Sequence, residues 1–506
     1  SFWPQIDARA DSCLGQKCPE FDACFITRMR QQALESDVVI VNHHLFFADL
    51  ALRGGDYGAV LPDYSTIVFD EAHEIENVAA SYFGSSVSNF RVSDLLQDAQ
   101  KLVITEPDKA AELLKSIARL SQRSDAFWLS FRGDRLDDEF ASRYQRGGGA
   151  PQEMRYQLGE GYFFSQDEEG TYRLTAAGEA YASIANAIDR LIAALAVVKD
   201  PPPELDNIQR RAESLKFDFE FIVEGSEPGF VYWCEKRGRG VFLHATPIDV
   251  SGILEERLFS VAHSAVLTSA TMTAGSRFDF IKKRLGIQQA HELIVESHFD
   301  FESQAVLYLP KRMPDPRNRE FLNASVEEIV QILEATNGRA FVLFTSVASM
   351  RETYERVRGL IDFPIFIQGQ GSKDGLLERF RNTEGAVLFA TSSFWQGVDV
   401  QGEALSCVII SKLPFAVPTD PVVAARQKHI DEQGGNSFFE YSVPEAIITL
   451  KQGLGRLIRS TSDRGVLSIL DPRVRTKPYG KLFLQSLPPC HITHNIEEAA
   501  AIFDGS

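Results

Sequence analysis

The sequence lacks any apolar run that reaches the roughly 20 residues needed to cross a bilayer. It also lacks a positively charged start followed by an apolar core and a cleavage site, and its first residue is Ser1 rather than Met. Only 6 cysteines occur in 506 residues, too few and too unevenly spaced for a disulfide framework. These absences predict a cytoplasmic protein with no membrane contact.

Positive charge is also scarce. Lys and Arg total 52 against 70 Asp and Glu, which gives a formal net charge of -18. This balance argues against a protein that coats nucleic acid through bulk electrostatics. It does not exclude a protein that grips a few phosphates in one groove, because only the local field in the groove matters there.

A glycine loop for nucleotide phosphates is missing as well. No G-x-x-x-x-G-K-S/T turn, which wraps backbone amides around phosphates, occurs in the sequence. The stretch "GQGSKDG", residues 369–375, is rich in glycine and contains a lysine, but neither Ser nor Thr follows that lysine. The sequence therefore offers no phosphate cradle of this type.

Short runs of Val, Ile and Leu, each leading into a helical pattern, are the main feature that is present. Such continuous runs are typical of strands covered on both faces in parallel α/β sheets. The chain has 506 residues, of which 44% are apolar, enough for two or three domains with their own cores. Two sheets are the simplest interpretation of the runs. The runs of the first block are 38–42, 66–70 and 265–270, and those of the second are 305–310, 340–346, 364–369, 386–393, 407–411 and 465–470.

The interval 85–235 has a different sequence pattern from the two blocks of apolar runs. It contains apolar residues at three- and four-residue spacing, from Ala177 to Leu191, and breakers at "RGGGAP" and "KDPPPE". Between residues 91 and 230 it carries 17 Lys and Arg against 25 Asp and Glu. We interpret it as an acidic, mainly helical insertion in the first sheet domain.

The stretch "STIVFDEAHEIENVA", residues 65–79, places Asp70 and Glu71 at the carboxyl end of a predicted strand. Open α/β sheets hold ligand-contacting residues at that edge. There one carboxylate can hold Mg²⁺ while the next orients and deprotonates a water molecule. The alternative is that both acids only favour the start of the following helix.

Four further segments combine small, polar or cationic residues with predicted strands or helices. "LTSAT" (267–271) and "FTS" (344–346) end strands with hydroxyl residues, and "ATSSFWQGVDV" (390–400) follows a strand with a glycine that allows close backbone approach. "LKQGLGRLIRS" (450–460) places Gln452, Arg456 and Arg459 on one face if it is helical. Such guanidinium groups can reach from one domain to a phosphate held by another.

In this order, the segments resemble the motifs of superfamily 2 helicases. "DEAH" is similar to motif II, "SAT" to III, "FTS" to IV, "QGVD" to V and "QGLGRLIR" to VI. Within that superfamily the chain resembles the XPD branch, and most closely the bacterial DinG and YoaA helicases. The insertion looks like the arch domain of that branch, and C-x4-C-x5-C before "NHHLFF" looks like the last three ligands of its iron-sulfur cluster.

The resemblance implies roles for individual residues. It assigns ATP and Mg²⁺ binding to Asp70, with His73, Gly397 and Asp399 as further nucleotide-binding residues. Ser269, Thr271, Ser346 and Trp395 would couple hydrolysis to DNA contact, although Trp395 and Phe394 can equally pack under the domain. Cys13, Cys18 and Cys24 would hold a 4Fe-4S cluster. The expected catalytic residues are Glu71, Gln452, Arg456 and Arg459.

The implied fold is α/β, with two RecA-like parallel-sheet domains, the first of them incomplete. The implied activity is ATP-dependent 5′ to 3′ translocation on single-stranded DNA and unwinding in DNA repair or replication, with forked or branched DNA and single-strand-binding or replication proteins as partners. The expected domains are 1–37 for an iron-sulfur remnant, 38–84 with 236–297 for helicase domain 1, 85–235 for the arch and 298–506 for helicase domain 2.

In the family, the phosphate loop and the first cluster cysteine precede the region that this sequence covers. We therefore expect the chain to be the C-terminal majority of a longer protein, to lack ATPase activity by itself, and to hold an incomplete cluster. Alternatives remain for the cysteines: Zn²⁺ with His43 or His44 as a fourth ligand, or unligated structural thiols.

Three other functions remain open at this stage. The first is a DNA-binding or scaffold protein with a degenerate, inactive helicase core. The second is an RNA helicase of the DEAH type, against which the cysteine triplet and the insertion count. The third is a helicase-like nuclease, although no carboxylate-rich nuclease motif occurs beyond residue 471.

Overall fold

The computed structural model describes residues 13–53, 60–131, 153–166, 171–199, 201–391, 394, 404–455 and 457–503. The chain divides into two compact units. The first unit comprises Ser1–Ile67, Ile75–Ser264 and Pro418–Arg426, and the second unit comprises Val68–Glu74, Ala265–Val417 and Gln427–Ser506. None of the described helices combines the length and the apolar character of a membrane span.

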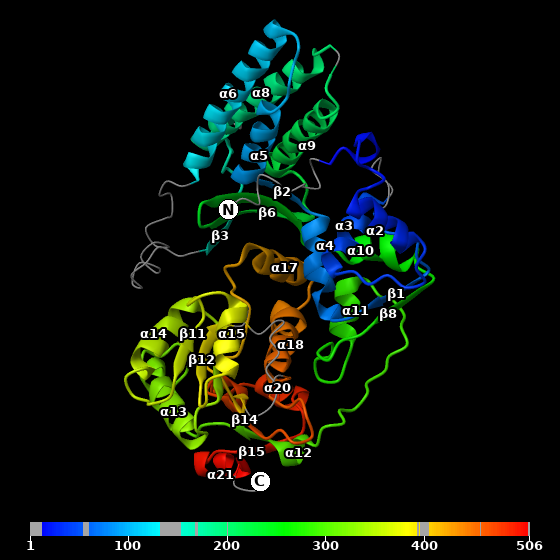
Figure 1. Cartoon of the computed structure of the whole chain (residues 1–506). Helices are drawn as coiled ribbons and strands as arrows, with labels where there is room; N and C mark the ends of the chain where they lie inside the picture. The colour runs from blue at the N-terminus through cyan, green and yellow to red at the C-terminus, as the bar shows by residue number, and fades with distance from the viewer. Residues whose placement is uncertain are drawn as a thin grey trace. The chain divides into compact units, whose positions relative to one another are not determined.

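Long helices dominate the first unit (Figure 1). Leu120, Ile188 and Leu215 come from three of them and are completely buried in one core. Residues 177–191, predicted to be helical, lie in α8, so that prediction is confirmed. The helices are η2 (Gly15–Lys17), α2 (Phe25–Leu34), α3 (His43–Leu52), α4 (Ile75–Tyr82), α5 (Asn89–Gln100), α6 (Pro107–Ser130), α8 (Ala176–Ala196), α9 (Leu205–Glu224), α10 (Ser251–Leu254) and η5 (Glu255–Phe259).

An antiparallel sheet of four strands, in the order β2-β7-β6-β3, lies beneath these helices and was not anticipated. Tyr232, Cys234 and Leu243 on one of its faces belong to the helices' core. The predicted end of the helical insertion, between residues 235 and 236, falls inside β6. The sheet extends beyond that boundary, because β7 is its next strand. Its strands are β2 (Ser85–Ser88), β3 (Glu153–Gln157), β6 (Phe230–Arg237) and β7 (Gly240–Pro247), and a separate hairpin joins β4 (Phe164–Gln166) to β5 (Tyr172–Leu174).

The first predicted parallel sheet contains two strands, β1 (Thr66–Phe69) and β8 (Ser264–Leu267). The Ser264 N–H donates to Ser65 O, and four residues on in both strands the Thr268 N–H donates to Phe69 O, so the strands run parallel. The prediction of a strand at 38–42 was wrong. That segment pairs with neither strand, and its Ile40 side chain is 94% exposed, because apolar residues form a strand only where a neighbour accepts their backbone hydrogen bonds.

The second unit is built on a seven-stranded sheet in the order β11-β12-β10-β13-β14-β9-β15, with parallel pairing throughout. All six predicted strands of the second block are confirmed, and each is shorter than predicted. The three-residue β15 was not predicted. The strands are β9 (Ala305–Tyr308), β10 (Ala340–Phe344), β11 (Ile365–Ile367), β12 (Val387–Thr391), β13 (Cys407–Ile410), β14 (Gly465–Ile469) and β15 (His491–Thr493).

Helices cover both faces of this sheet, as the continuous apolar strands predicted (Figure 1). Phe341 and Leu343 of β10 pack with α15, α18 and α20, whereas Val342 and Phe344 pack with α13, α14 and α21. The helices of this unit are η3 (Ala72–Glu74), α11 (Asp279–Leu285), α12 (Phe301–Gln304), α13 (Phe321–Ala335), α14 (Val347–Val357), α15 (Lys373–Arg381), η7 (Phe438–Ser442), α18 (Val443–Leu454), α19 (Arg473–Thr476), α20 (Gly480–Ser486), α21 (Ile496–Ala500) and η8 (Ala501–Phe503), and α17 (Pro421–Glu432) contributes residues to both units.

Candidate functional site

The candidate site in the second unit begins where β1 ends. Glu71 has a φ of 49°, in the left-handed region that residues other than glycine rarely adopt. The Glu71 N–H donates to Asp70 Oδ1 at 3.0 Å, and the Thr268 hydroxyl donates to the same oxygen at 3.3 Å. A helix cap would accept an N–H two or three residues further on. Asp70 therefore does not cap η3 in this structure, and its carboxylate is held in a fixed orientation at the strand end.

His73 is the centre of a hydrogen-bonded chain. Its side chain is only 9% exposed. Nδ1 lies 2.9 Å from Ser269 Oγ, and Nε2 lies 2.6 Å from Gln452 Nε2. When the Gln452 amide donates to Nε2, a neutral imidazole carries its proton on Nδ1 and donates to Ser269. The Ser269 hydroxyl in turn donates to Glu71 Oε2 at 3.0 Å.

Three separate elements supply this chain: the turn after β1, the segment after β8, and the last turns of α18. Thr271 supports the arrangement, because its N–H donates to Ser269 Oγ at 3.1 Å and its hydroxyl lies 3.4 Å from His73 Nδ1. The structure thus brings together the predicted residues Glu71, His73, Ser269, Thr271 and Gln452.

Lys451 makes a second connection between α18 and the segment after β8, and sequence reasoning missed it. Its Nζ donates to the carbonyl and hydroxyl oxygens of Thr273, both at 3.3 Å. Burial lowers the pKa of this amine. Its position next to Gln452 was the only signal in the sequence for this contact. A lysine on a helix is otherwise more often solvated than buried.

The prediction of one helix that carries both Gln452 and Arg459 was wrong. Helix α18 ends at Leu454, with Gly455 as its C-cap. Beyond that point, the N–H groups of Arg459 and Ser460 donate to Asp463 Oδ2 at 2.8 and 2.9 Å instead of continuing the helical ladder. Arg456 lies outside the described residues.

The remaining predicted residues are less informative. Ser346 caps α14, since its hydroxyl accepts the Ser349 N–H at 3.2 Å. Trp395, Gly397 and Asp399 lie outside the described residues. Phe394 is 5% exposed and belongs to the core of the second unit, which favours packing over base stacking for this ring.

The cysteine triplet does not form a metal site in this structure. Across the described ranges, no three His, Cys, Asp or Glu side chains gather in a group that could hold a metal ion. Cys24 occupies the position just before α2, and the backbone N–H groups of Thr27 and Ile26 lower the pKa of its thiol. Cys234 and Cys407 are fully buried, as expected for packed residues.

Comparisons with known proteins show which family the chain resembles. A family model described as Helicase C-terminal domain matches residues 329–490. The ATP-dependent DNA helicase YoaA of Haemophilus influenzae is 37% identical over 495 residues, which cover 98% of this chain and 73% of that protein. The ATP-dependent helicase DinG of Mycobacterium tuberculosis is 31% identical over 507 residues, which cover 99% and 71%.

A solved XPD helicase has the same fold, with a TM-score of 0.52 at 14% identity over 92% of this chain and 74% of that one. The similarity to YoaA and DinG, which extends over almost the whole chain, defines the class as a helicase. The chain belongs to the XPD/DinG-like family of superfamily 2 helicases.

Proposed function

We propose that this chain carries the DEAH motif and the C-terminal half of the motor of an ATP-dependent DNA helicase that moves 5′ to 3′ along single-stranded DNA. The observation that carries the proposal is the hydrogen-bonded chain from Gln452 through His73 and Ser269 to Glu71. It connects a helix of the C-terminal sheet to the carboxylate proposed to act on water. The names of the relatives support the same activity.

Asp70 is the residue that would hold Mg²⁺. The fit rests on an exposed carboxylate at the end of a strand with one buried face, oriented by two hydrogen bonds to Oδ1. When bound, Mg²⁺ neutralises charge on the phosphates of ATP. Asp70 orients that ion, and Glu71 orients the attacking water and accepts its proton.

His73 and Gln452 position Glu71 through Ser269. A movement of α18 would therefore change the orientation of the Glu71 carboxylate. Ser269 and Thr271 are proposed to transmit this change to the DNA-binding surface, with Ser346 and Trp395 as further contacts. Arg456 and Arg459 are proposed to neutralise charge that develops on the γ-phosphate. Gly397 and Asp399 are proposed to bind the nucleotide.

The proposed domains keep the expected boundaries except at the end of the arch. Residues 38–84 with 236–297, and residues 298–506, are proposed as two RecA-like domains, with 85–235 as an arch and 1–37 as an iron-sulfur remnant. The antiparallel sheet that joins β6 to β7 supports moving the end of the arch to Pro247. Forked or branched DNA, and single-strand-binding or replication proteins, are the proposed partners of this cytoplasmic enzyme in DNA repair or replication.

A 4Fe-4S cluster on Cys13, Cys18 and Cys24 stays a prediction. The described thiols do not form a metal-binding group, so no step of the mechanism involves the cluster. Iron, sulfide and zinc analysis of anaerobically purified protein separates a cluster from a zinc site or from unligated thiols.

The test of the proposed function is ATP hydrolysis by a protein that contains this chain together with a phosphate-binding loop. We expect single-stranded DNA to stimulate hydrolysis, and a duplex with a 5′ tail to be unwound while one with a 3′ tail is not. This chain by itself should not hydrolyse ATP. DNA binding without hydrolysis in the longer protein would instead support the alternative of an inactive scaffold.

A further inference from the structure

Helix α17 is held near its middle by a buried ion pair that the proposed function does not use. The Arg426 guanidinium Nη2 lies 2.8 Å from Glu76 Oε1, and its Nη1 donates to Asn77 Oδ1 at 3.1 Å. Arg426 and Glu76 are only 3% and 7% exposed. One guanidinium thus holds two consecutive side chains of α4, a contact that fixes orientation as well as distance.

This buried pair is a costly way to stabilise a fold. Taking both charges out of water costs free energy that their attraction offsets only in part, and apolar side chains of similar volume are often equally stabilising. What the pair adds over an apolar contact is the fixed orientation of its partners. The element that it orients is the first turn of α4.

The first turn of α4 follows the DEAH segment without an intervening loop. Helix η3 carries His73 and ends at Glu74, and α4 begins at Ile75. Glu76 is therefore three residues from His73 along a continuous helical path. A shift of Glu76 would move the imidazole with it.

The next residue of α17 contacts the element that precedes α18. Gln427 Nε2 donates to Ser442 Oγ at 2.9 Å. Ser442 is the last residue of η7, and α18, which carries Gln452, follows directly. Arg426 and Gln427 therefore connect one helix to both partners of the hydrogen bond between His73 and Gln452.

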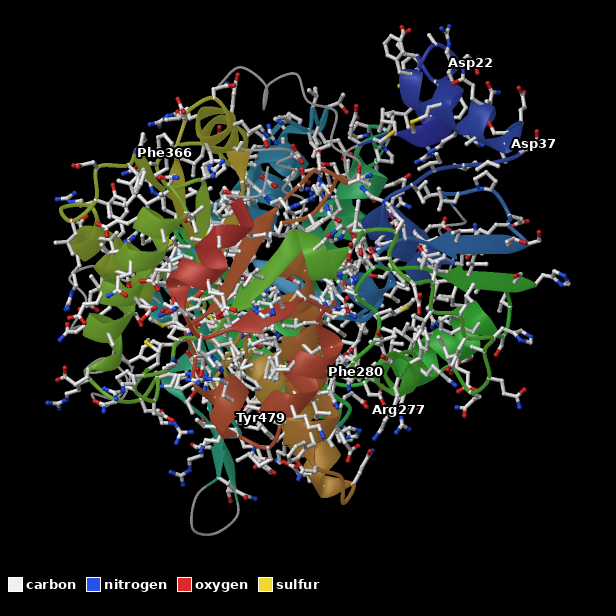
Figure 2. All side chains as sticks on the ribbon, turned by 90° about the horizontal axis from the view of Figure 1, so that it is seen from below. Asp22, Asp37, Arg277, Phe280, Phe366 and Tyr479 are labelled. Carbon is white, nitrogen blue, oxygen red and sulfur yellow. The ribbon has the colours of Figure 1, made fainter. Side chains whose placement is uncertain are left out.

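Helix η7 is itself firmly held, so that it can support this contact. Its Tyr441 is 3% exposed. Two residues of α11 contact the Tyr441 ring: Phe280, labelled in Figure 2, at a centroid distance of 6.4 Å, and the Arg284 guanidinium at 5.2 Å. The hydrogen bond to Ser442 thus connects α17 to a packed element.

The start of α17 is fixed as well. Asp420 Oδ1 accepts the N–H groups of Val422 and Val423 at 3.0 and 3.2 Å, which caps the helix. The other oxygen of Asp420 lies 3.4 Å from Arg155 Nη1. Helix α17 is therefore held at its start and near its middle, as a stiff connecting element requires.

We propose that Arg426 is a positioning residue for ATP hydrolysis, and that α17 is a brace that sets the distance between His73 and Gln452. Arg426 holds α4, and with it His73, while Gln427 holds the start of α18, and with it Gln452. This inference rests on the proposed function, because it takes the contact between His73 and Gln452 as the support of Glu71. It adds a second connection to their direct hydrogen bond of 2.6 Å.

The test replaces the ion pair by an apolar pair in a protein that contains this chain together with a phosphate-binding loop. Glu76→Met combined with Arg426→Met should keep a urea midpoint close to that of the wild type, because apolar side chains can replace a buried ion pair without loss of stability. Its kcat for DNA-stimulated ATP hydrolysis should fall about tenfold, with KM for ATP changed by less than about twofold, because the loss affects the reacting water and not nucleotide binding. Adding Gln452→Ala should lower kcat little further, since both changes loosen the same contact.

The matched control replaces another ion pair of the first unit. Arg211 Nη1 on α9 lies 2.8 Å from Asp98 Oδ2 on α5, and Asp98→Met with Arg211→Met should leave kcat unchanged. Gln427→Ala tests the other contact of α17 without a buried charge, and should lower kcat about threefold, as expected for one lost hydrogen bond. Its control is Lys428→Ala, the exposed next residue of the same helix, which should behave like the wild type.

The outcomes separate this inference from the proposed function. An unmodified protein that does not hydrolyse ATP would refute the proposed function, and the brace with it. Hydrolysis by the unmodified protein, with wild-type kcat in both the Glu76/Arg426 and the Gln427 variants, would refute the brace alone. So would losses that multiply fully when Gln452→Ala is added, because independent sites combine in that way. Gln427→Ala decides the question if the double Met variant does not fold.

Discussion

His73 and Gln452, 379 positions apart in the sequence, face each other through their Nε2 atoms at 2.6 Å. The second ring nitrogen of His73 is held by Ser269, so the imidazole has a partner on each side. An amide that donates to a largely buried imidazole fixes its tautomer and therefore the direction of the Ser269 hydroxyl. We propose that this contact makes Gln452 a positioning residue for Glu71, which it reaches through His73 and Ser269.

Gln452→Ala should lower DNA-stimulated ATP hydrolysis in a protein that also carries a phosphate loop, by about tenfold, because Ser269 and Glu71 lose their fixed orientation. His73→Ala should have a similar effect. The double variant should be hardly worse than either single one, with an interaction free energy of about 0.5 to 3 kcal/mol from the kcat/KM values.

Gln485→Ala, an exposed substitution on α20, serves as the control and should leave kcat/KM unchanged. Fully additive losses in the double variant would show that His73 and Gln452 act independently.

Glu71→Gln should reduce the rate of ATP hydrolysis at least about 10²-fold, because the amide can no longer accept a proton from water. Nucleotide binding should persist, since the change is isosteric and Asp70 is intact. Phosphate release and equilibrium binding of a fluorescent nucleotide measure the two effects separately. Glu302→Gln, an exposed acid on α12, is the matched control. Wild-type turnover in Glu71→Gln would remove this residue from its proposed role.

Asp471→Ala should destabilise the chain by about 3 to 5 kcal/mol, because it leaves the partly buried guanidinium of Arg473 without its partner. Asp471 is fully buried and accepts the Leu413 N–H at 2.9 Å and the Arg473 Nη2 group at 2.6 Å. Urea denaturation followed by circular dichroism gives the free energy of unfolding. Asp362→Ala, an exposed acid without such contacts, should change it by less than about 0.5 kcal/mol. Equal values for both variants would contradict the prediction.

The sequence predicted the second unit well because its strands are buried on both faces. Val342 and Phe344, for example, are both inaccessible, and so the stretch 340–344 is apolar throughout. The same signal failed at 38–42, where Val38 and Ile40 are exposed. Apolar content identifies what a strand can bury, but the presence of a pairing neighbour is a property of the whole fold.

The antiparallel sheet of the first unit was missed although a signal existed. In β7, Val241, Leu243 and Ala245 are buried and alternate with Phe242 and His244, which is the two-residue period of a sheet with one covered face. The search for continuous apolar runs passed over this alternation.

The site itself was predicted as a set of motifs but not as a geometry. The order of the segments indicated which residues act together. It could not show that His73 contacts Gln452, because a contact across 379 positions depends on how several elements pack. Nor could it show that the helix ends at Leu454, since the glycine at position 455 is tolerated in some helices and ends others.

Glu328 offers a test of stability against pH. It lies on α13 and accepts the Tyr308 hydroxyl at 2.5 Å, and burial raises the pKa of its carboxyl despite that hydrogen bond. A pKa that is higher in the folded than in the unfolded chain means that folding favours the protonated form. Its contribution to stability is complete below the unfolded pKa near 4.5 and is lost as the pH rises through the folded pKa.

Glu328→Gln should therefore make the chain more stable than the wild type at pH 7, because the amide keeps an acceptor for Tyr308 without the buried charge. Near pH 4 the wild-type carboxyl is itself largely protonated, and the advantage should disappear. Urea midpoints at both pH values test this. Glu327→Gln changes the exposed neighbouring acid and should show no such gain at pH 7. A Glu328→Gln variant less stable than the wild type at pH 7 would mean that the ionised carboxylate contributes more through Tyr308 than its burial costs.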